Sequence, residues 1–296
     1  MLSIKELDVS HLIGKEIGTS TILSELARGG MAIVFIAYQR TLKRRIAAKI
    51  LPKSHLTPKT AQLFQQEAEA AAILDHPNII QIYEVGEVDE FIFFTMQLVR
   101  GKPLTHLMKT ASKHVLPSRR IMPLGFTFRI VAQILDALDY AHQQEIIHRD
   151  IKPDNIMIEK QSQRPIITDF GVAKVLRDGD EDDSIARGTP LYMAPEQIIG
   201  ETTDGRTDIY AVGAMLFQML VPRLPLPRFD SYDALLKHKL LNRNGFFLKN
   251  PSDLNPFLNK EIDGIVKRAM AYESENRYNN CSQFKERLEW YQQKYL

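Results

Sequence analysis

The sequence is poor in cysteine, in net charge and in long apolar runs, and each shortage excludes a class of protein. Its one cysteine, Cys281, cannot form an internal disulfide, so a disulfide-stapled secreted domain is excluded. The best candidate for a membrane span, Ile209 to Val221, is too short to cross a bilayer and predicts a buried helix. Lys and Arg number 38 against 36 for Asp and Glu, and the net charge of +2 predicts no nucleic-acid partner.

The first residues also lack a targeting signal. The stretch MLSIKELDVSH contains neither the basic region nor the apolar region of a secretory signal peptide. With the single cysteine, this predicts a cytoplasmic protein that has no membrane segment within the chain. Neither observation bears on an anchor outside the 296 residues of this sequence, or on its oligomeric state.

What the sequence does contain is the composition of a folded, two-lobed protein. Hydrophobic residues make up 44% of the chain and charged residues 25%, which is enough apolar surface to bury a core. The length of 296 residues exceeds the roughly 100 to 200 residues of a typical domain. We therefore expect an N-terminal extension over 1–20, a small lobe over 21–99 and a larger lobe over 100–296.

The small lobe is expected to be a five-stranded antiparallel sheet with one helix. Short runs rich in β-branched and aromatic residues are bounded by turn-forming residues, as strands are. The predicted strands are Thr21–Leu26, Ile33–Gln39, Arg45–Leu51, Ile79–Val85 and Phe91–Val99. Between the third and fourth, Pro58–Leu74 contains no glycine and repeats apolar residues at helical spacing, which predicts a helix.

The larger lobe is expected to be mainly α-helical, so that the fold class is α+β. Apolar residues recur at helical spacing in five long segments. The predicted helices are Pro123–Gln144, Gly205–Leu220, Tyr232–Leu241, Glu261–Ala271 and Ser282–Tyr295. No internal repeat is present, and the acidic run Asp178–Asp183 predicts a loop.

Two short motifs in the larger lobe carry chemistry. The string His-Arg-Asp-Ile-Lys-Pro-Asp-Asn occupies 148–155, and Asp-Phe-Gly occupies 169–171. Together they resemble the catalytic loop and the metal-binding motif of protein kinases. A lysine two residues after the aspartate resembles the serine/threonine branch, and the motif style is that of bacterial members of the eukaryotic-like (Hanks-type) group. The resemblance covers Thr21 to Tyr295 and implies the two-lobed protein-kinase fold.

The resemblance implies a kinase that transfers the γ-phosphate of ATP to Ser or Thr hydroxyls of proteins, with the help of Mg2+. It assigns Asp150 to the proton of the attacking hydroxyl and Lys152 to the γ-phosphate. It assigns Asn155 and Asp169 to the magnesium ions. Each side chain suits its role, because Asn and Asp offer hard oxygen ligands and Lys offers a positive charge with three N–H donors.

A lysine in the small lobe completes the phosphate site in this resemblance. Ile-Ala-Ala-Lys at 46–49 is similar to the family's Val-Ala-Ile-Lys, so Lys49 is expected to bind the α and β phosphates. Glu67 on the following helix is expected to pair with Lys49 and orient it. Glu69 is the competing partner, but two residues advance a regular helix by about 200 degrees and turn Glu69 to another face.

Residues 26–34 occupy the place of the family's glycine-rich loop, with two departures from its pattern. Ala27 and Ala32 replace the first and third glycines of G-x-G-x-x-G-x-V, while Gly29 is kept and is joined by Gly30. This pair can supply the tight turn that lets backbone N–H groups approach phosphate. The expected nucleotide-binding residues here are Leu26, Ala27, Arg28, Gly29, Gly30, Met31, Ala32, Ile33 and Val34.

The segment from Met96 to Val99 resembles the connection between the lobes, where adenine binds in the family. The backbone groups of Gln97 and Val99 are expected to bind adenine, and Met96 is expected to act as gatekeeper. The side chains expected to sandwich the purine are Val34, Ala47 and Met157.

The segment Gly188–Glu196 favours a protein substrate, because it resembles the family's substrate-docking segment. The resemblance places Thr189 beside Asp150 and Lys152. Small-molecule phosphotransferases of related fold do not carry this segment. An enzyme acting on a metabolite is therefore the less favoured alternative.

Two structural contacts also follow from the resemblance. Glu196 is expected to form an ion pair with Arg277, and Asp208 is expected to fix the backbone of the catalytic loop. Removing one partner of a buried ion pair costs about 3 to 5 kcal/mol, so these residues are expected to support the lobe more than the chemistry.

Regulation is expected in the loop between Asp169 and Glu196. Arg149 directly precedes the catalytic aspartate, a placement that in the family marks kinases whose loop is ordered by a phosphate. Autophosphorylation at Ser184 or Thr189 would supply that phosphate, or acidic residues at 178–183 would already occupy its place, or those acids only solvate the loop. Carboxylates are the favoured partner, because a phosphate beside so many acids meets like-charge repulsion.

A second class of function stays open at this point. A pseudokinase scaffold would keep the fold and recruit partners without turnover. It is favoured only by Ala27, Ala32 and the unusual loop, whereas every expected catalytic position is filled.

Overall fold

The computed structural model divides the chain into two compact units, one ending at Arg100 and the other beginning at Gly101. Each unit is described by itself. The residues that the structure describes are 8–29, 32–53, 68, 72–88, 91–116, 120–170, 190–243 and 245–296.

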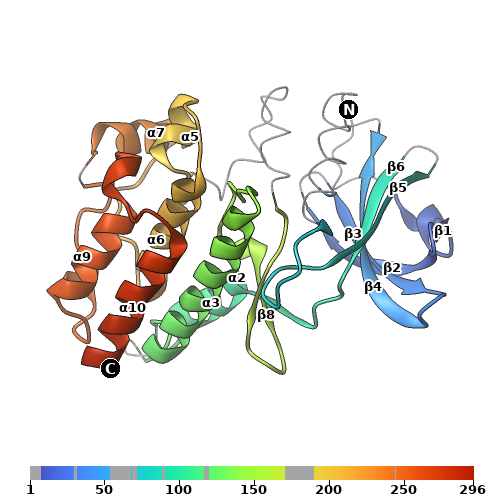
Figure 1. Cartoon of the computed structure of the whole chain (residues 1–296), viewed down its shortest axis with the longest axis horizontal. Coiled ribbons are helices and arrows are strands. Elements are labelled where there is room, and N and C mark those ends of the chain that lie inside the picture. The colour runs from blue at the N-terminus through green and yellow to red at the C-terminus, as the bar shows by residue number, and fades with distance from the viewer. Residues whose placement is uncertain are drawn as a thin grey trace. The chain divides into compact units, whose positions relative to one another are not determined.

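The first unit is a six-stranded antiparallel sheet in the order β1-β2-β3-β4-β6-β5, drawn in blue to green in Figure 1. Its strands are β1 (Glu16–Ile17), β2 (Ser20–Arg28), β3 (Ile33–Gln39), β4 (Arg44–Pro52), β5 (Ile82–Val88) and β6 (Phe91–Met96). The alternation of Ile33, Phe35 and Ala37 buries one face of β3, as the period of two in a strand requires.

The sheet has six strands rather than the predicted five, because the segment before Thr21 adds β1. Val9, Leu12 and Ile17 are buried in the same core as Phe35, so residues 8–20 pack into the first unit. Their spacing follows neither a helical nor a strand period, which is why the sequence predicted only an extension here. The helix predicted over Pro58–Leu74 lies largely outside the described residues.

The second unit is mainly helical and carries a small antiparallel sheet. Its helices are α2 (Leu104–Ser112), α3 (Leu124–Gln143), α5 (Pro195–Ile199), α6 (Gly205–Leu220), α7 (Tyr232–Leu241), α8 (Pro251–Leu254), α9 (Lys260–Ala269) and α10 (Cys281–Tyr295). The sheet has the order β7 (Gly101–Pro103), β8 (Ile156–Glu159) and β9 (Pro165–Ile167). The five predicted helices are confirmed, and the sequence missed α2, the short helices α5 and α8, and this sheet.

Helix α6 forms the centre of the second unit. It is the predicted apolar helix, and it packs against α3, α9 and α10 (Figure 1). Gly213 permits the close approach to α9, because a Cβ there would lie 2.8 Å from the Cβ of Ala269. Within the described part of the chain, no helix has both the length and the apolar character needed to span a membrane.

Candidate active site

One buried carboxylate holds the backbone of the His-Arg-Asp motif. Asp208, in the first turn of α6, accepts hydrogen bonds from the backbone N–H of His148 at 2.9 Å and of Arg149 at 2.8 Å. His142 on α3 lies 2.8 Å from the same carboxylate. Burial raises the pKa of Asp208, but these hydrogen bonds outweigh it and the pKa lies below its ordinary value of 3.8. The expected contact of Asp208 with this loop is confirmed.

The ring of His148 joins the two motifs through backbone groups. Its Nδ1 accepts a hydrogen bond from the backbone N–H of Asp150 at 3.2 Å, so its Nε2 carries the proton and donates to the carbonyl of Thr168 at 3.0 Å. The ring centroid also lies 4.6 Å from that of Phe170. His148 is completely buried and therefore acts as a rigid connection rather than as a solvent-exposed base.

Asp150 receives two hydrogen bonds on one carboxylate oxygen. Lys152 Nζ donates to Asp150 Oδ2 at 2.6 Å, and Asn155 Nδ2 donates to the same atom at 3.0 Å. Because both contacts fall on Oδ2, the other oxygen of this nearly buried carboxylate is the one suited to accept a proton from a substrate. The structure thus brings together three of the predicted catalytic residues.

Asn155 and Asp169 offer the oxygen atoms that a magnesium ion prefers. The amide Nδ2 of Asn155 also donates to the Asp150 carbonyl at 2.9 Å, which leaves its side-chain oxygen as a possible ligand. The backbone N–H of Thr168, next to Asp169, donates to the Asn155 carbonyl at 2.9 Å and ties the two segments together. Within the described ranges no three His, Cys, Asp or Glu residues cluster as metal ligands. Magnesium fits a pair like this one, because it is usually bound by one or two side chains together with substrate phosphates.

In the first unit, the predicted phosphate-binding residues lie on adjacent strands. Ala27 on β2 pairs with Val34 on β3, which in turn pairs with Lys49 on β4. Lys49 Nζ lies 5.6 Å from the centroid of the Phe94 ring on β6. Its predicted partner Glu67, and the competitor Glu69, lie outside the described residues, so this ion pair stays a prediction.

The hairpin of the glycine-rich loop is closed by a backbone hydrogen bond. The N–H of Gly29 donates to the carbonyl of Ala32 at 2.8 Å, while Gly30 and Met31 lie outside the described residues. The side chain of Arg28 donates to Glu25 at 2.7 and 2.8 Å.

Leu26 and Ile33 flank this hairpin with opposite exposure. The Leu26 side chain is about half exposed, whereas Ile33 is buried in the core of the sheet. The side chain of Ile33 thus serves packing, and its contact with a nucleotide stays a prediction.

The predicted adenine-binding residues fall in both units. Ala47 pairs with Met96 across β4 and β6, and the N–H of Gln97 donates to the Gln81 carbonyl at 2.9 Å. This N–H is thus engaged within the first unit, and the adenine contact of Gln97 stays a prediction. Val99 follows β6 in the first unit. Met157 lies on β8 of the second unit, opposite Ile166, so its predicted pairing with Val34 and Ala47 across a purine stays a prediction.

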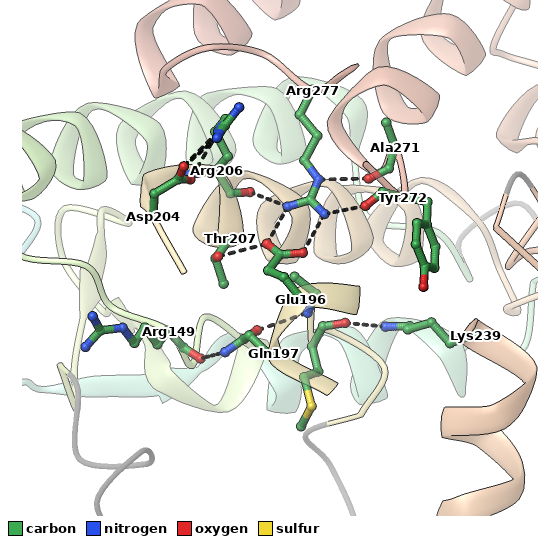
Figure 2. Close-up of polar contacts among 12 residues, drawn as sticks. Arg149, Glu196, Gln197, Asp204, Arg206, Thr207, Lys239, Ala271, Tyr272 and Arg277 are labelled. Carbon is green, nitrogen blue, oxygen red and sulfur yellow. Dashed lines mark hydrogen bonds and ion pairs between the residues drawn. The ribbon is translucent and has the colours of Figure 1, made fainter. Parts of the chain in front are cut away.

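The described part of the predicted docking segment, residues 190–196, is anchored by a buried ion pair (Figure 2). Both guanidinium NH groups of Arg277 donate to Glu196, each at 2.7 Å. Thr207 Oγ1 donates to the same carboxylate at 2.9 Å. Arg277 also donates to the backbone carbonyls of Arg206, Ala271 and Tyr272. The predicted pair of Glu196 with Arg277 is confirmed.

Two residues that the motifs did not point to connect this docking segment with its surroundings. The Nε2 of Gln197 on α5 donates to the backbone carbonyl of Arg149 at 2.9 Å, which links the segment to the catalytic loop (Figure 2). Lys239 on α7 donates to three backbone carbonyls of the segment. Neither Gln197 nor Lys239 belongs to a motif. Their hydrogen bonds join positions more than 40 residues apart, so no local sequence pattern predicts them.

The switch expected at Ser184 or Thr189 falls on residues outside the described ranges, as does the acidic run. Arg149 is described, and its Nε donates to Thr203 Oγ1 at 3.1 Å. The backbone of Arg149 has a positive φ of 65°. The structure therefore describes Arg149 held at Thr203, and its role in a switch stays a prediction.

We expect Glu196→Gln to lower the free energy of unfolding by about 3 to 5 kcal/mol near neutral pH, because it leaves a buried guanidinium without its countercharge. Burial raises the pKa of Glu196, but the hydrogen bonds and charge of Arg277 outweigh it and hold the pKa below 4.5. A carboxylate with a depressed pKa stabilises the fold above its unfolded-state pKa and loses that contribution as pH falls through its folded-state value. The difference in the free energy of unfolding between the Glu196→Gln chain and the unchanged chain should therefore shrink below pH about 4.5.

Urea unfolding at several pH values measures this difference. Glu201→Gln is the control, because Glu201 is an exposed carboxylate just beyond α5. It should change stability by less than about 0.5 kcal/mol. A Glu196→Gln chain as stable as the control at neutral pH would contradict the importance of the ion pair.

The chain is similar to known proteins over almost its whole length. The family model described as "Protein kinase domain" matches residues 20–288. The chain is 32% identical over 286 residues to the serine/threonine-protein kinase Pkn1 of Myxococcus xanthus, and 34% over 275 residues to PrkC of Bacillus subtilis. It is 30% identical over 295 residues to a protein named tyrosine-protein kinase MasK, also of Myxococcus xanthus.

The match to Pkn1 covers 94% of this chain and 39% of Pkn1. The match to PrkC covers 91% of this chain and 40% of PrkC, and the match to MasK covers 94% of this chain and 44% of MasK. The chain thus spans about two fifths of the length of the curated relatives it matches. A crystal structure of the Mycobacterium tuberculosis PknI kinase domain superimposes with a TM-score of 0.72 at 26% identity, covering 94% of this chain and 98% of that one.

Proposed function

The chain belongs to the protein kinase family, and we propose that the protein transfers the γ-phosphate of ATP to Ser or Thr hydroxyls of protein substrates. The domain is of the eukaryotic-like serine/threonine type, as the sequence predicted. The family uses ATP and a divalent metal ion. The observation that carries the proposal is the arrangement around Asp150, where one carboxylate oxygen is held by Lys152 and Asn155.

Asp150 is the proton acceptor in this proposal. The substrate hydroxyl attacks the γ-phosphorus as the bond to the β–γ bridging oxygen breaks and ADP leaves. The hydroxyl proton passes to Asp150, whose position the hydrogen bonds from Lys152 and Asn155 support. Lys152, only 2.6 Å from Asp150 Oδ2, also supplies positive charge to the γ-phosphate as negative charge builds up there.

Asn155 and Asp169 are the proposed magnesium ligands. Bound magnesium would neutralise charge on the phosphates of ATP. The hydrogen bond from Thr168 to Asn155 supports this assignment, because it ties the residue before Asp169 to Asn155.

In the first unit, Lys49 is proposed to bind the α and β phosphates with Glu67 as its partner. Its cross-strand neighbour Val34 is the last residue of the segment in the place of the glycine-rich loop, which supports a phosphate site at this end of the sheet. Leu26 to Val34 are proposed to cover the phosphates. The proposed adenine-binding residues are Val34, Ala47, Met96, Gln97, Val99 and Met157.

We also propose a location and a mode of regulation for this kinase domain, both from the sequence. The domain is proposed to be cytoplasmic, where ATP and protein substrates are available. Autophosphorylation at Ser184 or Thr189, or a carboxylate of the acidic run, is proposed to supply the negative charge for Arg149.

Incubation of the chain with ATP labelled on the γ-phosphate and a bacterial proteome tests the proposal. Label on phosphoserine or phosphothreonine of proteins is expected. Label on phosphotyrosine would instead match the name of the relative MasK. Label on a metabolite would indicate a small-molecule kinase, and absence of label would indicate a pseudokinase. Any of these three outcomes would overturn the proposal.

A further inference from the structure

Lys239 is a buried lysine that none of the proposed chemical steps uses. It lies on α7, where it is the one fully buried residue of that helix, and it is only 1% exposed. Lysine is almost never fully buried unless its charge is matched by partners. Its environment therefore has to compensate for the loss of water.

The compensation comes from the backbone of the docking segment. Lys239 Nζ donates to the carbonyls of Pro190 at 2.8 Å, Leu191 at 2.8 Å and Met193 at 2.7 Å. Figure 2 shows Lys239 reaching from its helix toward this segment. An ammonium group has three N–H donors and no acceptor, so each donor is matched by one carbonyl.

Two aromatic rings complete the site. The ammonium lies 4.9 Å from the Tyr210 ring centroid and 4.5 Å from that of Phe246, within the range in which a ring face attracts a cation. Burial and the charge of Arg277 lower the pKa of Lys239, and Glu196 acts in the opposite sense. The three carbonyls favour the charged form, because a neutral amine has only two N–H donors.

These contacts fix the course of a segment that has no regular structure. Residues 190–194 lie in turns and extended chain, and the described helix α5 begins only at Pro195. Pro190, Tyr192 and Met193 are buried, whereas Leu191 is half-buried. Lys239 thus binds the backbone of this irregular segment at three of the four residues from 190 to 193.

We propose that Lys239 is a positioning residue for protein substrates, holding residues 190–193 in the backbone conformation that docks the substrate beside Asp150. The inference rests on the proposed function, since it assumes that this segment binds a protein. It adds that recognition of the substrate depends on a side chain 46 residues further along the chain than Met193.

Lys239→Met in the full chain tests this inference. Methionine keeps an apolar stem of similar length and removes all three donors, so three backbone carbonyls lose their hydrogen bond from Lys239 at once. The KM for a Ser/Thr peptide, selected from an array with the unchanged chain, should rise about tenfold or more. The KM for ATP and the rate of ATP hydrolysis by water should stay within about twofold.

Two control variants separate positioning from loss of stability. Lys237→Met removes an exposed lysine of the same helix and should leave every parameter unchanged. Ile262→Ala opens a cavity at a fully buried position of α9, a helix that takes no part in the three hydrogen bonds of Lys239, and should destabilise the fold without raising the peptide KM. An equal rise of the peptide KM in Ile262→Ala, or none in Lys239→Met, would overturn the inference.

Hydrogen exchange gives a readout that does not need activity. Amide exchange at residues 191–194 should accelerate in Lys239→Met and not in Ile262→Ala. Unchanged exchange there would overturn the positioning role. If the unchanged chain phosphorylates no peptide, the proposed function fails, and the substrate role fails with it, while the exchange data separately decide whether Lys239 holds the segment.

Discussion

The Asp150→Asn chain is expected to fold and to bind magnesium ATP, yet to transfer phosphate roughly 10^2 to 10^4 times more slowly than the unchanged chain. The change replaces one carboxylate oxygen by an amide of almost equal volume. The hydrogen bonds from Lys152 and Asn155 on Oδ2 can still be made by the amide oxygen. What is lost is the basic oxygen that we propose accepts the substrate proton.

Asp154→Asn is the matched control, because it makes the same change at an exposed carboxylate of the same loop. Steady-state peptide phosphorylation measures turnover, and binding of a fluorescent ATP analogue reports the nucleotide site. A chain with Asn at 150 that retains more than half of the activity would remove Asp150 from its proposed role.

The second large effect is expected from Lys49→Met, which should lower turnover by orders of magnitude with little change in overall fold. Lys49 lies in the middle of β4, between Val34 and Phe94 on its neighbours, so methionine can keep the packing of its stem. The positive charge proposed for the α and β phosphates is removed.

Lys53→Met is the control for this change, because Lys53 directly follows β4 and its side chain pairs at the surface with Glu87 at 2.9 Å. It should retain nearly full activity. Glu67→Gln and Glu69→Gln then identify the partner of Lys49. Greater damage from Glu69→Gln, with Glu67→Gln silent, would show that the helix turns the other way.

Helices were predictable from sequence where their ends carry local signals. Asp204, Ser231 and Asn280 each accept a hydrogen bond from a backbone N–H in the first turn of α6, α7 and α10, and these caps are visible in the sequence. Helix α2 was missed because it is short, with nine residues, and Pro103 before it makes no side-chain capping hydrogen bond.

The site residues were likewise predictable only where they lie in one local motif. Asp150, Lys152 and Asn155 fall within six consecutive residues, so one motif contains the whole cluster. The sequence shows Lys239 as one of two lysines on a predicted helix, with nothing that distinguishes it from Lys237. Its burial results from tertiary packing against Tyr210, Phe246 and residues 190–193, and neither propensity nor periodicity encodes that packing.

The pairing of Glu196 with Arg277 has a consequence during protein synthesis. The two residues are 81 positions apart in the sequence. Because ribosomes add roughly 5 to 20 residues per second, Arg277 is synthesised about 4 to 16 s after Glu196. Asp208 is made only 60 residues after His148, so the carboxylate that fixes the catalytic loop is available before the arginine that anchors the docking segment. In a nascent chain, the carboxylate that fixes the catalytic loop is thus present 69 residues before the arginine that anchors the docking segment, so the docking segment can reach its final anchored form only when nearly all of the domain has been translated.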